Sequence, residues 1–456
     1  MIYVLLVCLI VFFAISYLFS GRDYFAPSTV QILTFVGAVF MCIYFMWSLN
    51  CPHDFQWATI GMIAGSMAMS TIIGVIVHRI FVKIEIRSHT TESVNVSPIS
   101  NTITFFVMFV LVITIIWTLI EVRRIGGSSG NFFETMHSFR SLHGYTTESI
   151  AKFPWLLNQL VSLTQVLFIL YGFNLILFYG KLSVWQIVQN IIIIGLCILT
   201  LLLNGSRTPV VNNLIVLVII FHLLRIQKQE GYKQYSLRTF FRIGVLVFLV
   251  MALFFVSKSF VGRTGKNNTL NAAEYISYYV GSGFIALDNY FKHPPIPSNI
   301  FGKETFYKLI NFLTSYGIVD IPPYLIHLEF RSVGGGFTNN VYTFLRSYHY
   351  DFGMAGVFLL HGLCIVFLSV FYEYVKKKRG NIGILTFGMM YYSIVMSFFA
   401  ERFFSQIFSP NFVKQLAFLL VLYELLIRKR IRLKFRRPAY ALQPIPNQQE
   451  SQIIDS

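Results

Sequence analysis

Two polar segments interrupt an otherwise apolar chain, and they hold the side chains best suited to chemistry. The first, Asn204–Pro209, joins two apolar runs and places Arg207 close to a proline that can begin a helix. The planar guanidinium suits a phosphate or a carboxylate, and a helix N-terminus favours an anion at the same point. We therefore expect Arg207 to bind an anionic substrate; an arginine that snorkels from the hydrocarbon boundary is the alternative.

The second polar segment follows the glycine turn at 334–336 and ends at Gly353. Its hydrogen-bonding side chains include Asn340, Tyr342, Arg346, His349 and Asp351. Donors and acceptors beside aromatic rings are typical of a surface that binds sugar, and an ordinary polar loop that re-enters a helix is the alternative. His349 and Asp351 are also candidates for a general base, because both can accept a proton from a hydroxyl.

Further charged positions lie at the ends of apolar runs or in an amphipathic stretch. Glu401 ends one run and is either another candidate base or an anchor at the membrane interface. Arg263, followed by Lys266, comes after a different run and either clamps a phosphate or is solvated. Asp288 lies in an amphipathic stretch, where it is either a solvated residue or a contact to substrate.

The chain lacks the motifs of several large enzyme classes. No two aspartates form an Asp-X-Asp pair, and His-Glu-X-X-His does not occur. The one Gly-X-Ser-X-Gly match, Gly126–Gly130, follows a long apolar run and not the strand that a nucleophile elbow requires. The segment Gly262–Lys266 is too short for a phosphate-binding loop. We therefore expect neither metal-dependent nor triad hydrolysis, and we predict no metal site and no cofactor.

The composition indicates that lipid is the solvent for most of the chain. Of its 456 residues, 55% are hydrophobic and only 12% are charged, whereas soluble domains carry about 25% charged residues. The net charge of +17 comes mainly from lysines and arginines in short loops and in the C-terminal tail, a pattern that sets orientation in membranes. Nucleic-acid binding would need a basic soluble domain with exposed aromatics, so we predict no nucleic-acid partner.

Eleven apolar runs approach the length of about 20 residues that a membrane-spanning helix needs. They lie near 2–19, 29–48, 57–81, 102–121, 154–179, 184–204, 209–225, 239–257, 352–374, 382–399 and 410–427. The predicted fold class is all-α, a polytopic bundle of about eleven transmembrane helices. Lysines and arginines concentrate in alternate loops, which places the N-terminus outside and the C-terminus in the cytoplasm.

This pattern divides the chain into four parts. They are helices one to eight (1–257), a long extracytoplasmic loop (258–351), helices nine to eleven (352–427), and a basic tail (428–456) that we expect to be disordered. Within the long loop, apolar residues recur at helical spacing over 275–291 and 306–316. They predict two amphipathic helices lying in the membrane interface.

Three segments resemble the bacterial oligosaccharide repeat-unit polymerases, which include the O-antigen polymerases. They are Ser206–Pro209, Leu287–Tyr290 and the stretch from Asn340 to Gly353. The resemblance covers roughly residues 100–425 and extends to the helix count and the long late outer loop. Its motifs are short, and their order and placement carry the similarity.

The resemblance implies a glycosyltransferase on the outer face of the bacterial plasma (inner) membrane. Such enzymes join repeat units carried on undecaprenyl pyrophosphate by transferring the growing glycan to a sugar hydroxyl of the next lipid-linked unit, without a metal or a nucleotide. Cations would then stabilise the pyrophosphate leaving group. Arg207 matches the arginine-bearing junction of the family, and Arg263 and Arg346 are weaker candidates for this contact. Asn340, Tyr342 and Asp288 would also contact substrate, and Asp351, His349 and Glu401 remain unranked as the base.

The partners implied are undecaprenyl-pyrophosphate-linked oligosaccharide, membrane lipid and a regulator of polysaccharide chain length. Two other functions stay open: an O-antigen ligase-type glycosyltransferase, which moves finished polymer to a different acceptor, and a flippase for lipid-linked oligosaccharide. A transporter should show internal repeats and ionisable residues near the midplane of several helices. Charges here gather at the outer ends of the runs, which favours an enzyme.

Overall fold

The computed structural model describes residues 1–84, 96–127, 131–145, 152–228, 252, 255–256, 270–326, 328–378 and 380–429, and these are mainly helical. The longer helices are α1 (Ile2–Phe19), α2 (Pro27–Ser48), α3 (Trp57–Lys83), α4 (Asn101–Gly126), α6 (Trp155–Leu177), α7 (Val184–Leu203), α8 (Thr208–Lys228), α10 (Ala272–Lys292), α12 (Phe344–Lys378), α13 (Asn381–Val395) and α14 (Pro410–Leu426). Shorter ones are α5 (Phe132–Tyr145), α11 (Tyr307–Ser315) and the π-helix η3 (Phe403–Ile407). Strands β1 (Arg331–Gly334) and β2 (Phe337–Asn339) form an antiparallel hairpin.

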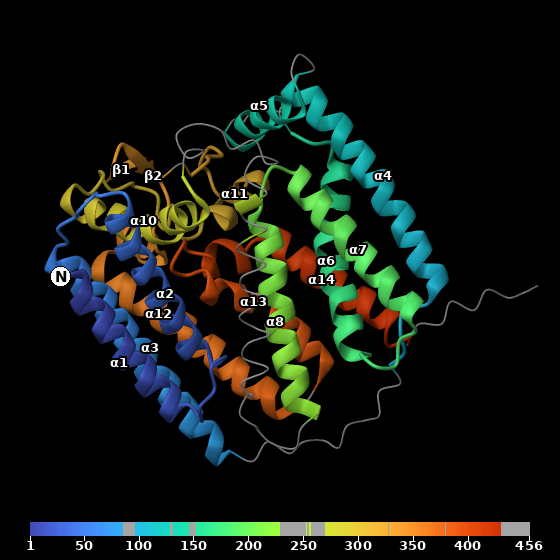
Figure 1. Ribbon diagram of the computed structural model, residues 1–456, viewed down its shortest axis with the longest axis horizontal. Helices are drawn as coiled ribbons and strands as arrows, with labels where there is room; N and C mark the ends of the chain where they lie inside the picture. The colour runs from blue at the N-terminus through green and yellow to red at the C-terminus, as the bar shows by residue number, and fades with distance from the viewer. Residues whose placement is uncertain are drawn as a thin grey trace, which may run out of the picture.

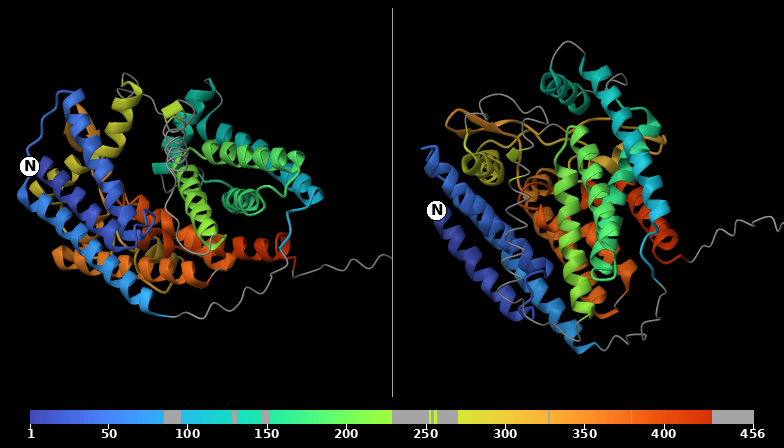
Figure 2. Two further views of the ribbon diagram at one scale, coloured as in Figure 1. Left: turned by 60° about the horizontal axis from the view of Figure 1, so that its bottom comes forward. Right: turned by 45° about the vertical axis from the view of Figure 1, so that its right-hand side comes forward.

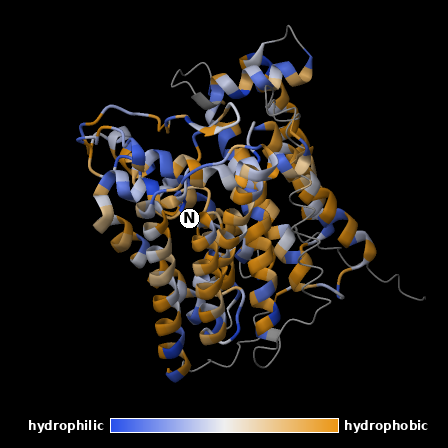
Figure 3. Cartoon of the chain, turned by 60° about the vertical axis from the view of Figure 1, so that its left-hand side comes forward, coloured by the Kyte–Doolittle hydropathy of each residue, from blue (hydrophilic) through white to orange (hydrophobic). Residues whose placement is uncertain are grey.

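Eight of these helices are long and apolar enough to cross a membrane: α1 to α4, α6 to α8, and α12. Their middle turns are hydrophobic and the hydrophilic residues gather toward the two ends of the bundle (Figure 3). Exposed aromatic residues mark both ends, with Trp47, Trp57 and Trp155 at one end and Tyr179 and Trp185 at the other. Such belts are typical of the two membrane interfaces. The chain is therefore a multi-pass helical membrane protein, as its composition predicts.

The helices pack in two groups with a seam between them (Figures 1 and 2). Helices α1, α2, α3 and α12 form one group, and α4, α6, α7 and α14 form the other. Helices α8 and α13 pack against each other along the seam, and each contacts both groups. Helices α5, α10 and α11 and the hairpin gather at one end of the bundle, which we call the α5 end (Figure 1).

Local sequence determines where several of these helices begin. Ser183 and Gln186 form a reciprocal capping box at the start of α7, and Asn271 and Glu274 form another at α10. Ser409 caps α14, whose first residue is a proline. These caps satisfy backbone N–H groups that would otherwise lack partners at a helix start.

Two helix boundaries differ from those expected from the apolar runs. Helix α12 begins at Phe344 rather than at 352, and it is broken at Gly353, whose φ of 64° is readily adopted by glycine. The turns before the break are polar, so hydropathy missed them. Helix α13 ends at Val395 rather than at 399, and η3 follows. Most of the expected span 239–257 and most of the tail lie outside the described residues, so the count of eleven spans stays a prediction.

Both amphipathic stretches of the long loop form helices, α10 and α11. Helix α10, however, does not lie on the surface in the way expected for the membrane interface. It packs against α2 so closely that a Cβ added at Gly281 would lie 2.4 Å from the backbone nitrogen of Cys42. Tyr275, Phe284 and Leu287 are fully buried. The apolar face of α10 therefore covers another helix instead of lipid.

Candidate functional site

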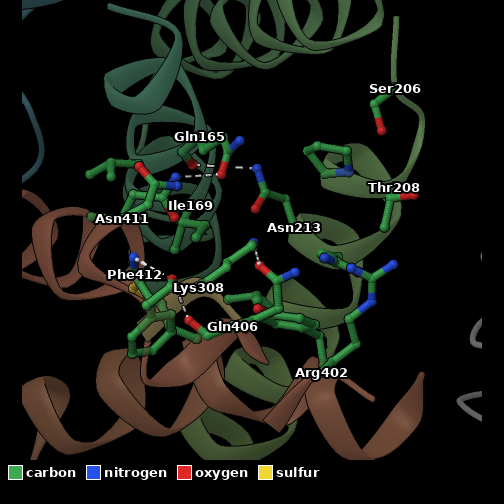
Figure 4. Close-up of a pocket in the computed structure, with 18 residues that line it drawn as sticks. Gln165, Ile169, Ser206, Thr208, Asn213, Lys308, Arg402, Gln406, Asn411 and Phe412 are labelled. Atoms are coloured by element: carbon green, nitrogen blue, oxygen red, sulfur yellow. Dashed lines mark hydrogen bonds between the residues drawn. The ribbon is translucent and has the colours of Figure 1, made fainter. Parts of the chain in front are cut away.

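A cavity of about 310 Å³ lies between α6, α8, α11, α13, η3 and α14 (Figure 4). Most of its lining side chains are polar: Gln165, Ser206, Thr208, Asn212, Asn213, Lys308, Tyr392, Arg402, Gln406, Ser409, Asn411 and Gln415. Its basic lining residues, within the part of the chain that the structure describes, are Lys308 and Arg402. No carboxylate lines it there, so the cavity favours an anion.

Two helix N-termini strengthen this preference. Thr208 and Pro209, the first residues of α8, line one side of the cavity. Ser409, Asn411 and Phe412, at the start of α14, line another. The Ser409 hydroxyl accepts the backbone N–H of Phe412 at 3.2 Å, which fixes that helix start. Helix N-termini carry partial positive charge and unpaired N–H groups, which suit a phosphate.

Glu401 fixes the turn that follows Arg402. The Glu401 carboxylate accepts the backbone N–H groups of Phe404 at 2.7 Å and Ser405 at 2.8 Å, and the hydroxyl of Tyr348 donates to it at 3.2 Å. These bonds fix the first turn of η3. Arg402 itself forms no ion pair with any described residue, and its Nε is shielded from solvent without a hydrogen-bond partner there. A buried donor left in this state is expected to find a ligand.

Amide side chains form the remaining polar wall. Gln415 donates to Gln165 Oε1 at 2.7 Å, and Lys308 Nζ donates to Gln406 Oε1 at 2.6 Å. The Oδ1 atom of Asn212 is shielded from solvent and accepts no hydrogen bond from a described residue. Amides offer both donors and acceptors, so this wall can bind hydroxyl groups of a ligand whose anionic part lies near Arg402.

The predicted junction at Arg207 lies beside this cavity, because Ser206 and Thr208 line it. The Arg207 side chain itself packs against α10. Its Nη2 donates to the Tyr275 hydroxyl at 3.1 Å, and its guanidinium carbon lies 5.5 Å from the ring centroid of Tyr279. The side chain is only 4% exposed. The predicted segment thus borders the cavity, while the Arg207 side chain is engaged by aromatic rings, and its role in binding substrate stays a prediction.

The structure brings Arg346 and Tyr342 together at the α5 end, away from the cavity lining. Arg346 is 2% exposed and pairs with Glu304 and Glu329. Its guanidinium carbon lies 4.7 Å from the ring centroid of Tyr342 and 5.1 Å from that of Tyr290. Both carboxylates already neutralise this cation, so the geometry gives Arg346 a structural role.

His349 and Asp351 belong to the same cluster. The Nδ1 atom of His349 lies 2.9 Å from the hydroxyl of Tyr290. Asp351 accepts the backbone N–H groups of Thr305 at 2.7 Å and Glu304 at 3.1 Å, which ties residues 304–305 to α12. Neither residue lines the cavity, and neither does Glu401. Their assignment as the base stays a prediction, and the observed contacts favour roles in holding the segment together.

Asp288 is a buried anchor between α10 and α3. Its carboxylate lies 2.9 Å from His53 Nε2 and 2.7 Å from Lys292 Nζ, and it accepts the Thr59 hydroxyl at 2.6 Å and the Gln56 N–H at 2.9 Å. Burial would raise the pKa of Asp288, but these hydrogen bonds outweigh it and lower the pKa below its ordinary value. The carboxylate is therefore ionised and fully engaged by the protein.

Two predicted contacts to substrate remain. Asn340 is half-buried, just after β2, and does not line the cavity. Arg263 lies outside the described residues. The side chains of the cavity that sequence reasoning missed are Arg402, Lys308 and the amides. The available signal was a set of amide residues inside apolar runs, above all Asn212 and Asn213, which follow the Arg207 junction directly.

Comparisons of the chain with protein-family models, curated proteins and solved structures find no match.

Proposed function

We propose that this protein is a polymerase that joins undecaprenyl-pyrophosphate-linked oligosaccharide repeat units into O-antigen or a related surface polysaccharide. The observation that carries the proposal is the cavity at the α5 end, where Arg402 and two helix N-termini face a space without a carboxylate among its described lining. A lipid pyrophosphate is an anion that must be bound at the membrane, and this cavity lies among membrane helices.

The division of the cavity into cationic and amide parts fits such a donor. The pyrophosphate would lie near Arg402 and the starts of α8 and α14, and the first sugar would face Gln165, Asn213 and Gln415. When the anomeric carbon leaves the phosphate oxygen, the pyrophosphate gains one negative charge. Preorganised cations stabilise that charge most in a site shielded from water. The protein would therefore supply electrostatic stabilisation and orientation.

The proposal includes a place in the cell. We place the protein in the bacterial plasma (inner) membrane with eleven spans, the N-terminus outside and the C-terminus in the cytoplasm, because lysines and arginines concentrate in alternate loops. The α5 end then faces the outer surface, where lipid-linked repeat units are polymerised. A regulator of chain length is a proposed partner.

The test is deletion of the gene in its native bacterium, followed by gel analysis of the surface polysaccharide. We expect single repeat units in place of the normal ladder, and restoration of the ladder by wild-type protein but not by the Arg402→Gln variant. Polymer of normal length that accumulates on its lipid carrier would contradict polymerisation and support a ligase. Single lipid-linked units trapped on the cytoplasmic face would instead support a flippase.

A further inference from the structure

Lys308 is placed unusually for a lysine of a membrane protein. It lies in the first turn of α11, and its side chain reaches into the cavity, where Nζ donates to Gln406 Oε1 at 2.6 Å (Figure 4). No carboxylate of the described chain forms an ion pair with it, while Arg402 lines the same cavity. Lys308 is partly shielded from solvent, and an ammonium group withdrawn from water without an anionic partner is destabilised, so this position favours the neutral amine.

The groups around the amine act in the same direction. Burial, reinforced by the guanidinium of Arg402, lowers the pKa of Lys308 to about 8, and Glu401 only partly opposes this. The other titratable neighbours are tyrosines, namely Tyr307 on α11 and Tyr392 on α13. Lys414 of α14 is held by Gln159 and Ser162. A substantial fraction of Lys308 is thus unprotonated at a mildly alkaline pH.

We propose that Lys308 is the general base that takes the proton from the acceptor hydroxyl, an inference that rests on the proposed function. The acceptor oxygen forms a bond to the anomeric carbon of the donor glycan, and the hydroxyl proton passes to the lone pair of the Lys308 amine. The bond from the anomeric carbon to the phosphate oxygen breaks, and its electron pair leaves with the lipid pyrophosphate. Gln406 accepts one amine hydrogen and so orients the lone pair.

This assignment couples proton transfer to stabilisation of the leaving group. The amine becomes an ammonium at the step in which the pyrophosphate gains one negative charge, so positive charge appears beside the anion when it is needed. The three other candidates for the base, two carboxyl groups and one imidazole, are not placed to act in this way. His349, Asp351 and Glu401 do not line the cavity, and the two carboxylates already accept backbone N–H groups.

The test is the pH dependence of polymerisation by purified protein in proteoliposomes, with undecaprenyl-pyrophosphate-linked repeat units as substrate. A base must be unprotonated, so kcat/KM should rise with pH up to about 8 and then level off. A lysine that only binds the pyrophosphate must be protonated, so it would give the opposite slope. A rate that falls as pH rises through this range would overturn the proposal.

Lys308→Arg separates the two roles further, because it keeps the positive charge and cannot give up a proton near neutral pH. We expect it to lower kcat by about 10²–10⁴-fold while the affinity for the lipid-linked substrate is retained. Lys303→Arg, in the same segment but outside the cavity lining, is the matched control and should behave as wild type. A Lys308→Arg variant that polymerises at the wild-type rate would overturn this inference alone, whereas an inactive wild-type protein would overturn the proposed function as well.

Discussion

Replacement of Arg402 by glutamine should sharply lower activity and spare the fold. The side chain has no ion-pair partner among the described residues, so its removal leaves no buried carboxylate uncompensated. It also removes one of the two basic side chains that line the cavity. We expect the free energy of unfolding to change by less than about 1 kcal/mol, as for substitutions that break no buried network.

The effect on catalysis should be much larger. If Arg402 stabilises the charge that develops on the leaving pyrophosphate, its loss resembles the loss of one oxyanion-hole donor, which costs about 10²–10³-fold in kcat, or about 2.7–4 kcal/mol. The assay is polymerisation of lipid-linked repeat units in proteoliposomes, together with thermal unfolding of the variant in detergent. An Arg402→Gln protein that is folded and polymerises at the wild-type rate would refute the assignment of the cavity.

Arg346→Gln is the matched contrast, because this arginine is paired. Its removal leaves Glu304, which is 8% exposed, as an uncompensated buried charge, and breaking such a pair costs about 3–5 kcal/mol. Glu329 is 32% exposed at its side chain and adds little, since solvent screens it. We expect a clear fall in thermal stability, and unchanged stability would contradict the structural role given to Arg346.

Two further predictions concern the packing of α10. Because the folded-state pKa of Asp288 is lowered, its carboxylate stabilises the fold at neutral pH, and this stability is lost as pH falls below about 4 toward the folded-state pKa. The Asp288→Asn variant should therefore unfold at a lower temperature than the wild type at pH 7, and its stability should depend less on acid pH. An unchanged melting profile would contradict the hydrogen-bond network around Asp288. Gly281→Ala should cost about 1–3 kcal/mol or more, because the added Cβ meets the backbone of Cys42. Gly283→Ala is its control, since the Cβ there would lie at an ordinary 3.4 Å from Val341 O, and equal stability of the two variants would show that α10 is not packed this closely.

Much of the fold could be predicted from sequence because a membrane helix satisfies its backbone hydrogen bonds within itself. Apolar runs therefore located α1 to α4 and α6 to α8 with few errors. The start of α12 was missed because its first turns are too polar to count as part of a span, and Gly353 then interrupts the helix. The burial of α10 depends on its fit to α2, which periodicity does not report.

The candidate site was predictable only in part, for a related reason. The Arg207 junction could be singled out from the sequence because a loop between two apolar runs is a local feature. The direction of its side chain depends on Tyr275 and Tyr279, which lie on α10 and far along the sequence. The cavity itself is assembled by packing from residues as distant as Gln165 and Gln415, so no short motif could reveal it.

The most direct test of the proposed function is polymerisation by the purified protein alone. Wild-type protein and the Arg402→Gln variant would be reconstituted with undecaprenyl-pyrophosphate-linked repeat units, and the glycans would be separated on a gel. We predict a ladder of lengthened lipid-linked glycans with the wild-type protein and single repeat units with the variant. Single repeat units with the wild-type protein, or equal ladders with both proteins, would contradict the function proposed for the cavity.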